Sequence, residues 1–451
     1  MVRWLAPAFV ALGATPVIAA SAPTFNKDVL PVLQRQCQTC HRPGEVAPMS
    51  LLTYKDTRPW AKAMKTAVLT KKMPPWFADP SVGHFTNTKS LTEAEVKTIA
   101  AWADGGAPEG NAKDAPPPVR FAEGWTIGKP DIVVQFPHEV QIPATGTVDQ
   151  ANLLVKVNFP KDLWVKAAEV RPGNRKAVHH MKAWVRPPGS AWLKDAPEGE
   201  LYNPRRGTVA DFAGGRGGAG AAGGGGRQGN TPGMVQDMLA KYNPGVEGQS
   251  FLVGGAAKFI PAGSDIVFEV HYNTTGKPET DRSSVGIVLA SGAPEFRYVT
   301  TTGVNNTRFA IPARDPHFAV KAESTVQHEV KLVWLQPHMH YRAKEYELRA
   351  IYPTGETELL LKVPDYSFAW QIGYEFAKPV VLPKGTRLES TTWYDNSVNN
   401  KFNPNPEIEV RYGPQSWDEM AVTFLGYIVE AKTDTGRVFS GPGRGAVPPI
   451  E

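Results

Sequence analysis

Short hydrophobic runs separated by clusters of Gly, Pro and Asn dominate the chain beyond residue 131. The runs are rich in Val, Ile, Phe and Tyr, and their regular spacing is typical of antiparallel β-sandwiches rather than of a parallel sheet. The predicted strands are Ile132 to Phe136, Leu153 to Phe159, Ala183 to Arg186, Ile266 to Tyr272, Val285 to Leu289, Val330 to Leu335, Tyr346 to Tyr352, Val380 to Leu382 and Met420 to Ala431. Roughly 320 residues exceed the core of one sandwich, so we expect two jelly-roll-like sandwiches, at 121–292 and 293–435, divided near residues 290–295.

A helical pattern occupies the N-terminal part of the chain instead. Thr92 and Glu95 have the spacing of a capping box, and a glycine pair at 105–106 ends the run. The apolar positions between them recur at helical spacing: Val96, Ile99, Ala100 and Ala103. We therefore predict a small all-α domain at 23–110, closed by this helix, and a proline-stiffened linker at 111–120.

The first 22 residues resemble a secretory signal. Arg3 precedes an apolar stretch, and small residues at 20–22 suit a cleavage site after Ala22. An uncleaved membrane anchor is the alternative, which Pro7 and Pro16 disfavour. Because no later segment approaches 18 apolar residues, we expect no transmembrane segment after cleavage and a periplasmic or secreted bacterial protein.

Composition narrows the possible partners. The 42 Gly and 41 Pro residues favour turns over long helices. The net charge of +5 comes without a basic run, so we expect no nucleic acid partner. A glycine-rich stretch at 213–230 lacks the pattern of a phosphate-binding loop and is interpreted as a surface insertion. Residues 436–451 are expected to form a flexible tail.

The only two cysteines of the chain stand in one motif, Cys37-Gln38-Thr39-Cys40-His41. This C-x-x-C-H arrangement is that of covalent haem attachment, in which both thiols add to the vinyl groups and His41 supplies the proximal imidazole. A redox dithiol or half of a zinc site is the alternative reading, but zinc would need further ligands. The motif predicts one covalent haem c.

A sixth iron ligand should be a thioether or imidazole from the same domain. The choices are Met49, Met64, Met73 and His84. We favour Met73, because the two prolines that follow it stiffen its loop, whereas Met64 lies in a helix-like stretch. From residue 25 to about 108, the haem motif, the proline-flanked methionine and the last helix resemble a small c-type cytochrome.

The remaining candidate chemistry lies in the histidines. His338 and His340 project from one face of a predicted strand, so that both can bind one metal while Met339 points away. A third, thioether ligand such as Met420 would suit copper(I). The adjacent His179 and His180 diverge on a regular strand, so both can bind one ion only at a bulge or a strand end.

His271 is the candidate that completes the second, all-imidazole site. It lies opposite the apolar face of its predicted strand. For each histidine taken alone, a hydrogen-bonded or exposed imidazole is the alternative, and for Met420 the alternative is core packing.

The order of these motifs, His-His-Met, His-Tyr, His-x-His and Asp-Glu-Met, resembles the copper type II, ascorbate-dependent monooxygenases, the family of peptidylglycine alpha-hydroxylating and dopamine beta-monooxygenases. The resemblance runs from about residue 131 to 432. It implies an electron-transfer copper on His179, His180 and His271, and an oxygen-binding, catalytic copper on His338, His340 and Met420. It further implies two copper ions on different sandwiches across a wet cleft, dioxygen activation, and hydroxylation of a substrate C–H bond.

Two features depart from that family. The chain has no cysteine outside the haem motif, whereas the animal peptide hydroxylases have several disulfides. Gln336 and Phe424 stand where those enzymes hold a substrate carboxylate with arginine and tyrosine. We therefore expect a small organic substrate of another kind, with dioxygen and an external electron donor as partners. A non-catalytic electron carrier or copper-storage protein is the alternative, and a cytochrome with the sandwiches as a docking scaffold is the weaker one.

Overall fold

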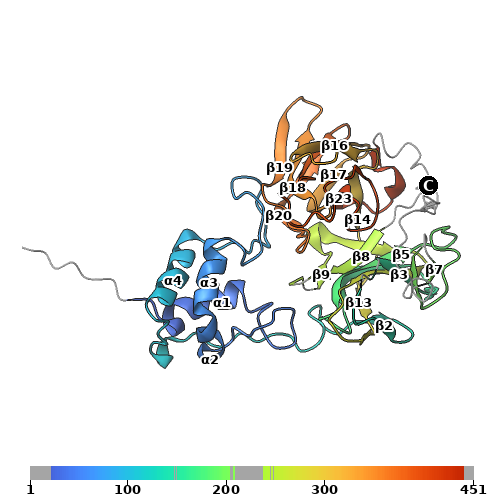
Figure 1. Ribbon diagram of the computed structural model, residues 1–451. Coiled ribbons are helices and arrows are strands. Elements are labelled where there is room, and N and C mark those ends of the chain that lie inside the picture. Colours follow the sequence, from blue (N-terminus) through green and yellow to red (C-terminus); the bar gives the residue numbers. More distant parts are fainter. Residues whose placement is uncertain are drawn as a thin grey trace, which may run out of the picture.

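The computed structural model describes residues 22–146, 148, 150–203, 207–208, 237–243, 245–246 and 248–440. The predicted signal before Ala22 and the glycine-rich stretch at 213–230 lie outside the described residues. The protein is mostly β, with a small helical region at the N-terminal side (Figure 1). The prediction of a predominantly β chain is confirmed.

The helical region has its own core. Its elements are η1 (Phe25–Val29), α1 (Leu30–Gln36), α2 (Tyr54–Thr57), η2 (Arg58–Trp60), α3 (Ala61–Leu69), α4 (Glu93–Asp104) and η3 (Ala112–Asp114). The predicted capping box of Thr92 and Glu95 is present at the start of α4. Trp102 and Phe25 are completely buried, and the Trp102 indole donates to the carbonyl of Pro108. The interior is thus held by aromatic packing between Phe25 of η1 and Trp102 of α4.

Two sheets form the first β-layered body. One contains β1 (Ile132–Gln135), β13 (Ser284–Leu289), β4 (Leu163–Arg171), β10 (Ala256–Ile260) and β9 (Gln249–Ser250). The other has the order β7 (Gly207–Thr208), β6 (Leu201–Asn203), β3 (Ala151–Val155), β11 (Asp265–Tyr272), β5 (Val178–Arg186) and β8 (Asp237–Tyr242). An antiparallel pair of short strands distant in sequence, β2 (Val140–Ile142) with β12 (Glu279–Asp281), forms a separate two-stranded sheet. One apolar cluster fills the space between the sheets.

The second body is built in the same way. Its first sheet has the order β14 (Phe296–Asn306), β23 (Ala421–Glu430), β17 (Val330–His338) and β20 (Tyr374–Leu382). Its second sheet has the order β19 (Thr357–Val363), β18 (Ala343–Ile351), β21 (Arg387–Tyr394), β16 (Phe318–Val326) and β24 (Phe439–Ser440). The short strands β15 (Ala310–Ile311) and β22 (Val410–Arg411) form a further pair. The strand β24 lies inside the range assigned to a flexible tail, so the ordered body extends to Ser440.

The two bodies are joined by more than a linker. β10 of the first pairs in parallel with β14 of the second, which makes one sheet of nine strands run through both. β14 begins at Phe296, close to the division predicted at residues 290–295. A shared sheet fixes the two bodies relative to each other, because its backbone hydrogen bonds cross the boundary.

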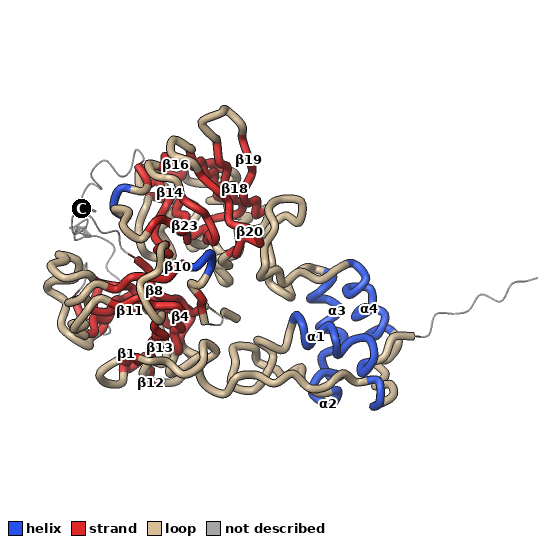
Figure 2. The backbone as a smooth tube through the Cα atoms, turned by 180° about the vertical axis from the view of Figure 1, so that it is seen from behind, coloured by secondary structure: helices blue, strands red, loops and turns tan. Residues whose placement is uncertain are grey.

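The helical region also contacts the β bodies through two loops that leave it (Figure 2). The segment after Met73 lies on β20, where Phe85 bridges to Phe376 and the Ala377 amide donates to the carbonyl of His84. Part of the range predicted as the small domain therefore packs on the second body. Among the described residues, no helix combines the length and the apolar character that a membrane span requires.

Candidate metal centres

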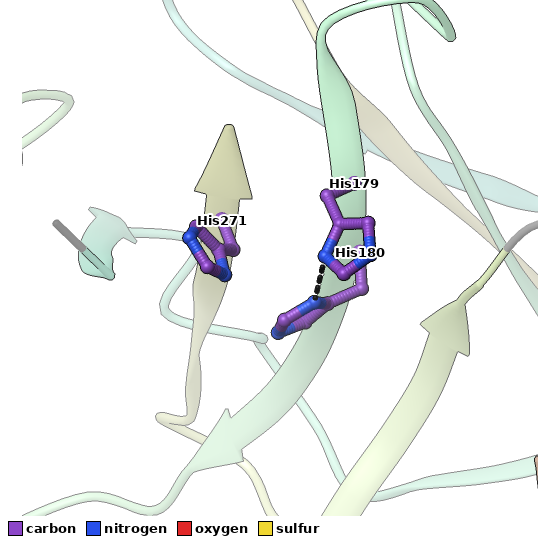
Figure 3. A group of neighbouring side chains, drawn as sticks. All are labelled: His179, His180 and His271. Atoms are coloured by element: carbon purple, nitrogen blue, oxygen red, sulfur yellow. Dashed lines mark hydrogen bonds between the residues drawn. The ribbon is translucent and has the colours of Figure 1, made fainter. Parts of the chain in front are cut away.

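Three histidines of the first body converge at the end of the pair formed by β5 and β11 (Figure 3). The register of this pair shifts after His271: His271 lies opposite His180, whereas Tyr272 lies opposite Val178. His179 is therefore the extra residue of a β-bulge, which is the irregularity that the adjacent histidines required. The bulge turns His179 and His180 toward His271, and the donor atoms of the three lie within 4.8 Å of one another.

The geometry of this three-histidine site suits one metal ion. The Nδ1 atoms of His179 and His180 are 3.1 Å apart, about the separation of two nitrogens that each bind one ion at roughly 2.0–2.1 Å. Burial lowers the pKa of His271 to about 4, and it also lowers the pKa of His179 and His180. Neutral imidazoles keep a lone pair for a metal, so the donor set fits copper or zinc.

His338 and His340 form a second pair in the other body. β17 ends at His338, and the two imidazole centroids are 5.3 Å apart. Met339 between them is buried in the core of the second body, as expected from the alternation of side chains along a strand. His338 Nδ1 is 2.8 Å from Gln371 Oε1, and His340 Nδ1 is 3.2 Å from the Asp418 carbonyl. Because acceptors occupy both Nδ1 atoms, both Nε2 atoms are left as donors for a metal.

The segment that precedes β23 is tied to this pair. The amides of His340 and Arg342 donate to the two carboxylate oxygens of Glu419, at 2.8 and 2.6 Å. The Tyr394 hydroxyl donates to the carbonyl of Met420 at 2.5 Å. These bonds hold Met420 beside the strand end that carries His338 and His340. The Met420 side chain is partly buried against the core of the first body, at the boundary between the two bodies.

One aromatic side chain stands between the two histidine groups. The Phe368 ring centroid lies 6.0 Å from that of His179 and 5.7 Å from that of His340. The ring centroids of His179 and His340 are therefore no farther apart than the sum of these two distances. His180, His338 and His340 are all at most 5% exposed. His179, His271 and Phe368 are partly exposed, so the two histidine groups lie close together without being fully enclosed.

Two buried lysines line the same region. Lys182 and Lys241 are direct neighbours across β5 and β8. Lys182 forms an ion pair with Glu269 at 2.7 Å, whereas Lys241 donates to Gln336 Oε1 at 2.7 Å. Burial lowers the pKa of Lys241 to about 7. Neither lysine was recognised from the sequence, because a lone lysine in a strand carries no distinguishing pattern.

Gln336 and Phe424, the positions of the missing carboxylate clamp, are both buried here. Gln336 donates its amide to the carbonyl of Gln371 at 2.8 Å, so both ends of its side chain are engaged within the protein. The Phe424 ring lies 5.0 Å from the ammonium group of Lys182 and 5.9 Å from the His338 ring. Neither side chain offers a charge to a substrate.

The haem motif lies in the loop after α1. Cys37 packs against the helical core, and burial raises the pKa of its thiol to about 12. His41 Nδ1 is 3.3 Å from the carbonyl of Met49, which leaves Nε2 as the donor for iron. A pair of thiols and an imidazole oriented in this way fit a covalent haem.

The four candidates for the sixth iron ligand differ in their surroundings. Met64 is buried in the helical core, and Met49 packs partly against it. The backbone of His84 is bonded to β20, outside the helical core. Met73 is partly exposed at the start of the segment that leaves the helices. Met73 therefore belongs neither to the helical core nor to the contact with β20, and its assignment as the axial ligand stays a prediction.

Comparisons with known proteins add little. No protein-family model matches the chain, and no curated protein matches it. Among solved structures, the chain is similar to that of the infectious bursal disease virus Gx strain, with 9% identity over 67% of this chain and 73% of that one and a TM-score of 0.17. A VP2 subviral particle of the same virus gives 10% identity over 69% and 75% of the two chains, again with a TM-score of 0.17. Similarities this low carry no information on the fold or the chemistry of this chain.

Proposed function

We propose that this chain is an exported haem- and copper-dependent monooxygenase that hydroxylates a C–H bond of a small organic substrate with dioxygen. The observation that carries the proposal is the pairing of two unlike histidine groups in neighbouring β bodies. His179, His180 and His271 are an all-imidazole set, whereas His340 is hydrogen-bonded to the segment that carries Met420. The order of the motifs resembles that of the copper type II monooxygenases, in which one copper transfers electrons and the other binds oxygen. An all-imidazole site and a site with a softer thioether ligand suit these two roles.

Different parts of the chain orient the ligands of the two sites. Copper, when bound, supplies one-electron redox chemistry and dioxygen activation. The bulge in β5 orients the first histidine set, while Gln371 and Asp418 fix the tautomers of His338 and His340. His180, His338 and His340 are buried, which limits the access of water to these three ligands. A reactive site of this kind needs such exclusion to avoid side reactions.

The position of the haem motif supports electron delivery from the cytochrome to the first copper site. A Cβ atom added to Gly245 would lie 2.7 Å from Cys40 Sγ, so this thiol sits directly on the backbone of the first body. Arg175 joins the same loop to that body through an ion pair with Glu45 at 2.5 Å. Tyr242, three residues before Gly245, pairs across the sheet with Met181, the neighbour of His180. A one-electron haem attached here would be close to the all-imidazole site.

Reoxidation of the haem tests this role. Protein with reduced haem and bound copper should reoxidise when dioxygen and substrate are added, at a rate independent of protein concentration. The His271→Ala variant should keep its haem reduced, because the first copper site is lost. If reoxidation is equally fast in that variant, the iron reacts by another route, and the fusion of the two parts does not serve electron delivery.

A second candidate function is a non-catalytic electron-transfer or copper-binding protein. The burial of His338 and His340 favours it, because an enzyme needs its second site open to a substrate. Uptake of dioxygen that depends on reductant and yields a hydroxylated product would decide for the enzyme. Copper that cycles between its oxidation states without a product would decide for the carrier.

A further inference from the structure

One loop of the second body contacts both histidine groups. This β19–β20 loop covers residues 364–373. The centroid of its Phe368 ring lies 6.0 Å from that of His179 and 5.7 Å from that of His340, and aromatic rings interact over roughly 4.5–7 Å. Burial lowers the pKa of His179, and a hydrogen bond from its ring to the backbone of Ala369 partly offsets this shift. Phe368 and its neighbour therefore support ligands of both proposed copper sites.

Two more residues of the β19–β20 loop hold the second histidine group. Gln371 Oε1 is 2.8 Å from His338 Nδ1. The Tyr366 hydroxyl donates to the Met339 carbonyl at 3.0 Å and accepts from the Met339 amide at 3.2 Å. Met339 stands between His338 and His340 in the sequence, so these bonds fix the backbone that carries both imidazoles. A single short segment thus orients ligands in both bodies.

The β19–β20 loop is not part of the rigid framework. Residues 364–373, all of which the structure describes, form neither strand nor helix. Phe368 is partly exposed and Ala369 is exposed. Loops with exposed side chains and few backbone bonds belong to the least stable parts of a fold, and ordering them has an entropic cost.

An ion that fixes the imidazoles also orders the loop that contacts them. The entropic cost falls on the first ion to bind, and the second ion meets a loop that is already ordered, which raises its affinity. Repulsion between the two ions acts in the opposite direction. Copper(I) carries only one charge, and the partly exposed surroundings of His179 and Phe368 screen it. The sign of the coupling therefore separates a shared loop from simple repulsion.

We propose that the β19–β20 loop, through Phe368, couples the two metal sites, so that an ion in the three-histidine site raises the copper affinity of the His338 and His340 site. This inference rests on the proposed function in one respect, namely that both sites hold copper. Linkage makes the effect reciprocal, because each ion raises the affinity for the other by the same factor. Phe368 is then a positioning residue shared by two sites, and protein with a single copper is a minor species during loading.

Copper(I) affinity, measured by competition with a chelator in the absence of oxygen, tests the coupling. His271→Ala isolates the His338 and His340 site, and Met420→Ala isolates the three-histidine site. The coupling factor is the product of the two affinities of the parent divided by the product of these single-site affinities. It should be about tenfold, within the range of roughly 5- to 150-fold that is typical of coupled sites.

The same factor is then measured with Phe368 changed. Phe368→Ala removes the ring, and the factor should fall to about one; Phe368→Leu takes its place if that variant does not fold. Phe368→Tyr keeps the ring and should keep the factor of the parent. Phe318→Ala changes a partly buried phenylalanine of β16 in the same body, and this matched control should also keep it.

Three results would overturn the inference. A parent that binds two coppers with a factor within threefold of one, or with a factor below one as expected for repulsion, leaves the proposed function intact but removes the coupling. A factor that stays unchanged in Phe368→Ala, even if each single site is weakened, would make the ring a structural support only. A parent that holds fewer than two coppers would contradict the proposed function, and the coupling with it.

Discussion

Lowering the pH should destabilise the metal-free protein through its buried histidines. Burial lowers the pKa of His271 and of His340 to about 4, below the value of roughly 6.5 expected in the unfolded chain. The unfolded state therefore binds protons first as the pH falls. Stability is present above pH 6.5, is lost as the pH drops through that value, and stops falling near pH 4.

The magnitude follows from these two values. At pH 5.5, protonation stabilises an unfolded histidine by about 1.4 kcal/mol, whereas the folded one is still neutral. His271 and His340 together should lower the free energy of unfolding by about 3 kcal/mol between pH 8 and pH 5.5. Urea unfolding of metal-free protein at the two pH values measures this difference, and the double variant His271→Asn with His340→Asn should show a pH dependence smaller by that amount.

Copper binding to the folded protein should, by contrast, depend little on pH in this range. An ordinary imidazole is about nine-tenths protonated at pH 5.5 and would lose roughly tenfold in copper affinity per ligand. Ligands that stay neutral should lose little, so competition with a chelator should give nearly the same affinity at pH 7 and pH 5.5. The exposed His317, changed to Asn, is the control for both experiments. A double variant that keeps the full pH dependence of unfolding, or a copper affinity that falls more than a hundredfold, would refute the reasoning.

Three further predictions concern the cofactors and the substrate. Mass spectrometry of denatured protein should show haem still attached, and Met73→Ala should change the haem from low spin to high spin without releasing it; unmodified thiols would contradict this. Met420→Ala and His271→Ala should each retain about one copper, because each removes a ligand of only one site; loss of both coppers from either variant would show that the assignment is wrong. Glycine-extended peptides should be poor substrates, since Gln336 and Phe424 offer no charge to a carboxylate; efficient turnover would show that another residue holds the carboxylate, and Lys241, which donates to Gln336, is a candidate.

Much of the fold follows from local patterns. The spacing of Thr92 and Glu95 predicts the start of α4, because a capping box involves only residues of one turn. The alternation in β11 predicts that Glu269 and His271 lie opposite the apolar face, and both are the less buried positions of that strand. The adjacent histidines required a bulge, and the register shift of β5 provides it.

The rest depends on contacts between distant parts of the chain. The parallel pairing of β10 with β14 joins the two bodies into one sheet, and no local pattern specifies which strand edges meet. The segment around Phe85 leaves the helical region and packs on β20, although its sequence neighbours belong to the small domain. Residues 436–451 are predicted as a flexible tail, yet Phe439 is buried and pairs with Val326 of β16.

The candidate site shows the same division. The histidines could be found from the sequence because their spacing is local. Glu419 belongs to the Asp-Glu-Met motif, but its role as acceptor for His340 and Arg342 depends on residues almost eighty positions away. Gln371 carries no sequence signal, since its function arises from a contact with His338, 33 positions away.

Metal content together with oxygen uptake tests the central claim most directly. Purified mature protein should contain one haem iron and two coppers, and it should consume dioxygen only when a reductant and a hydroxylatable substrate are both present. The consumption should stop in Met420→Ala while the haem and one copper remain. A protein that binds haem but no copper, or one whose oxygen uptake is unchanged in Met420→Ala, would contradict the account.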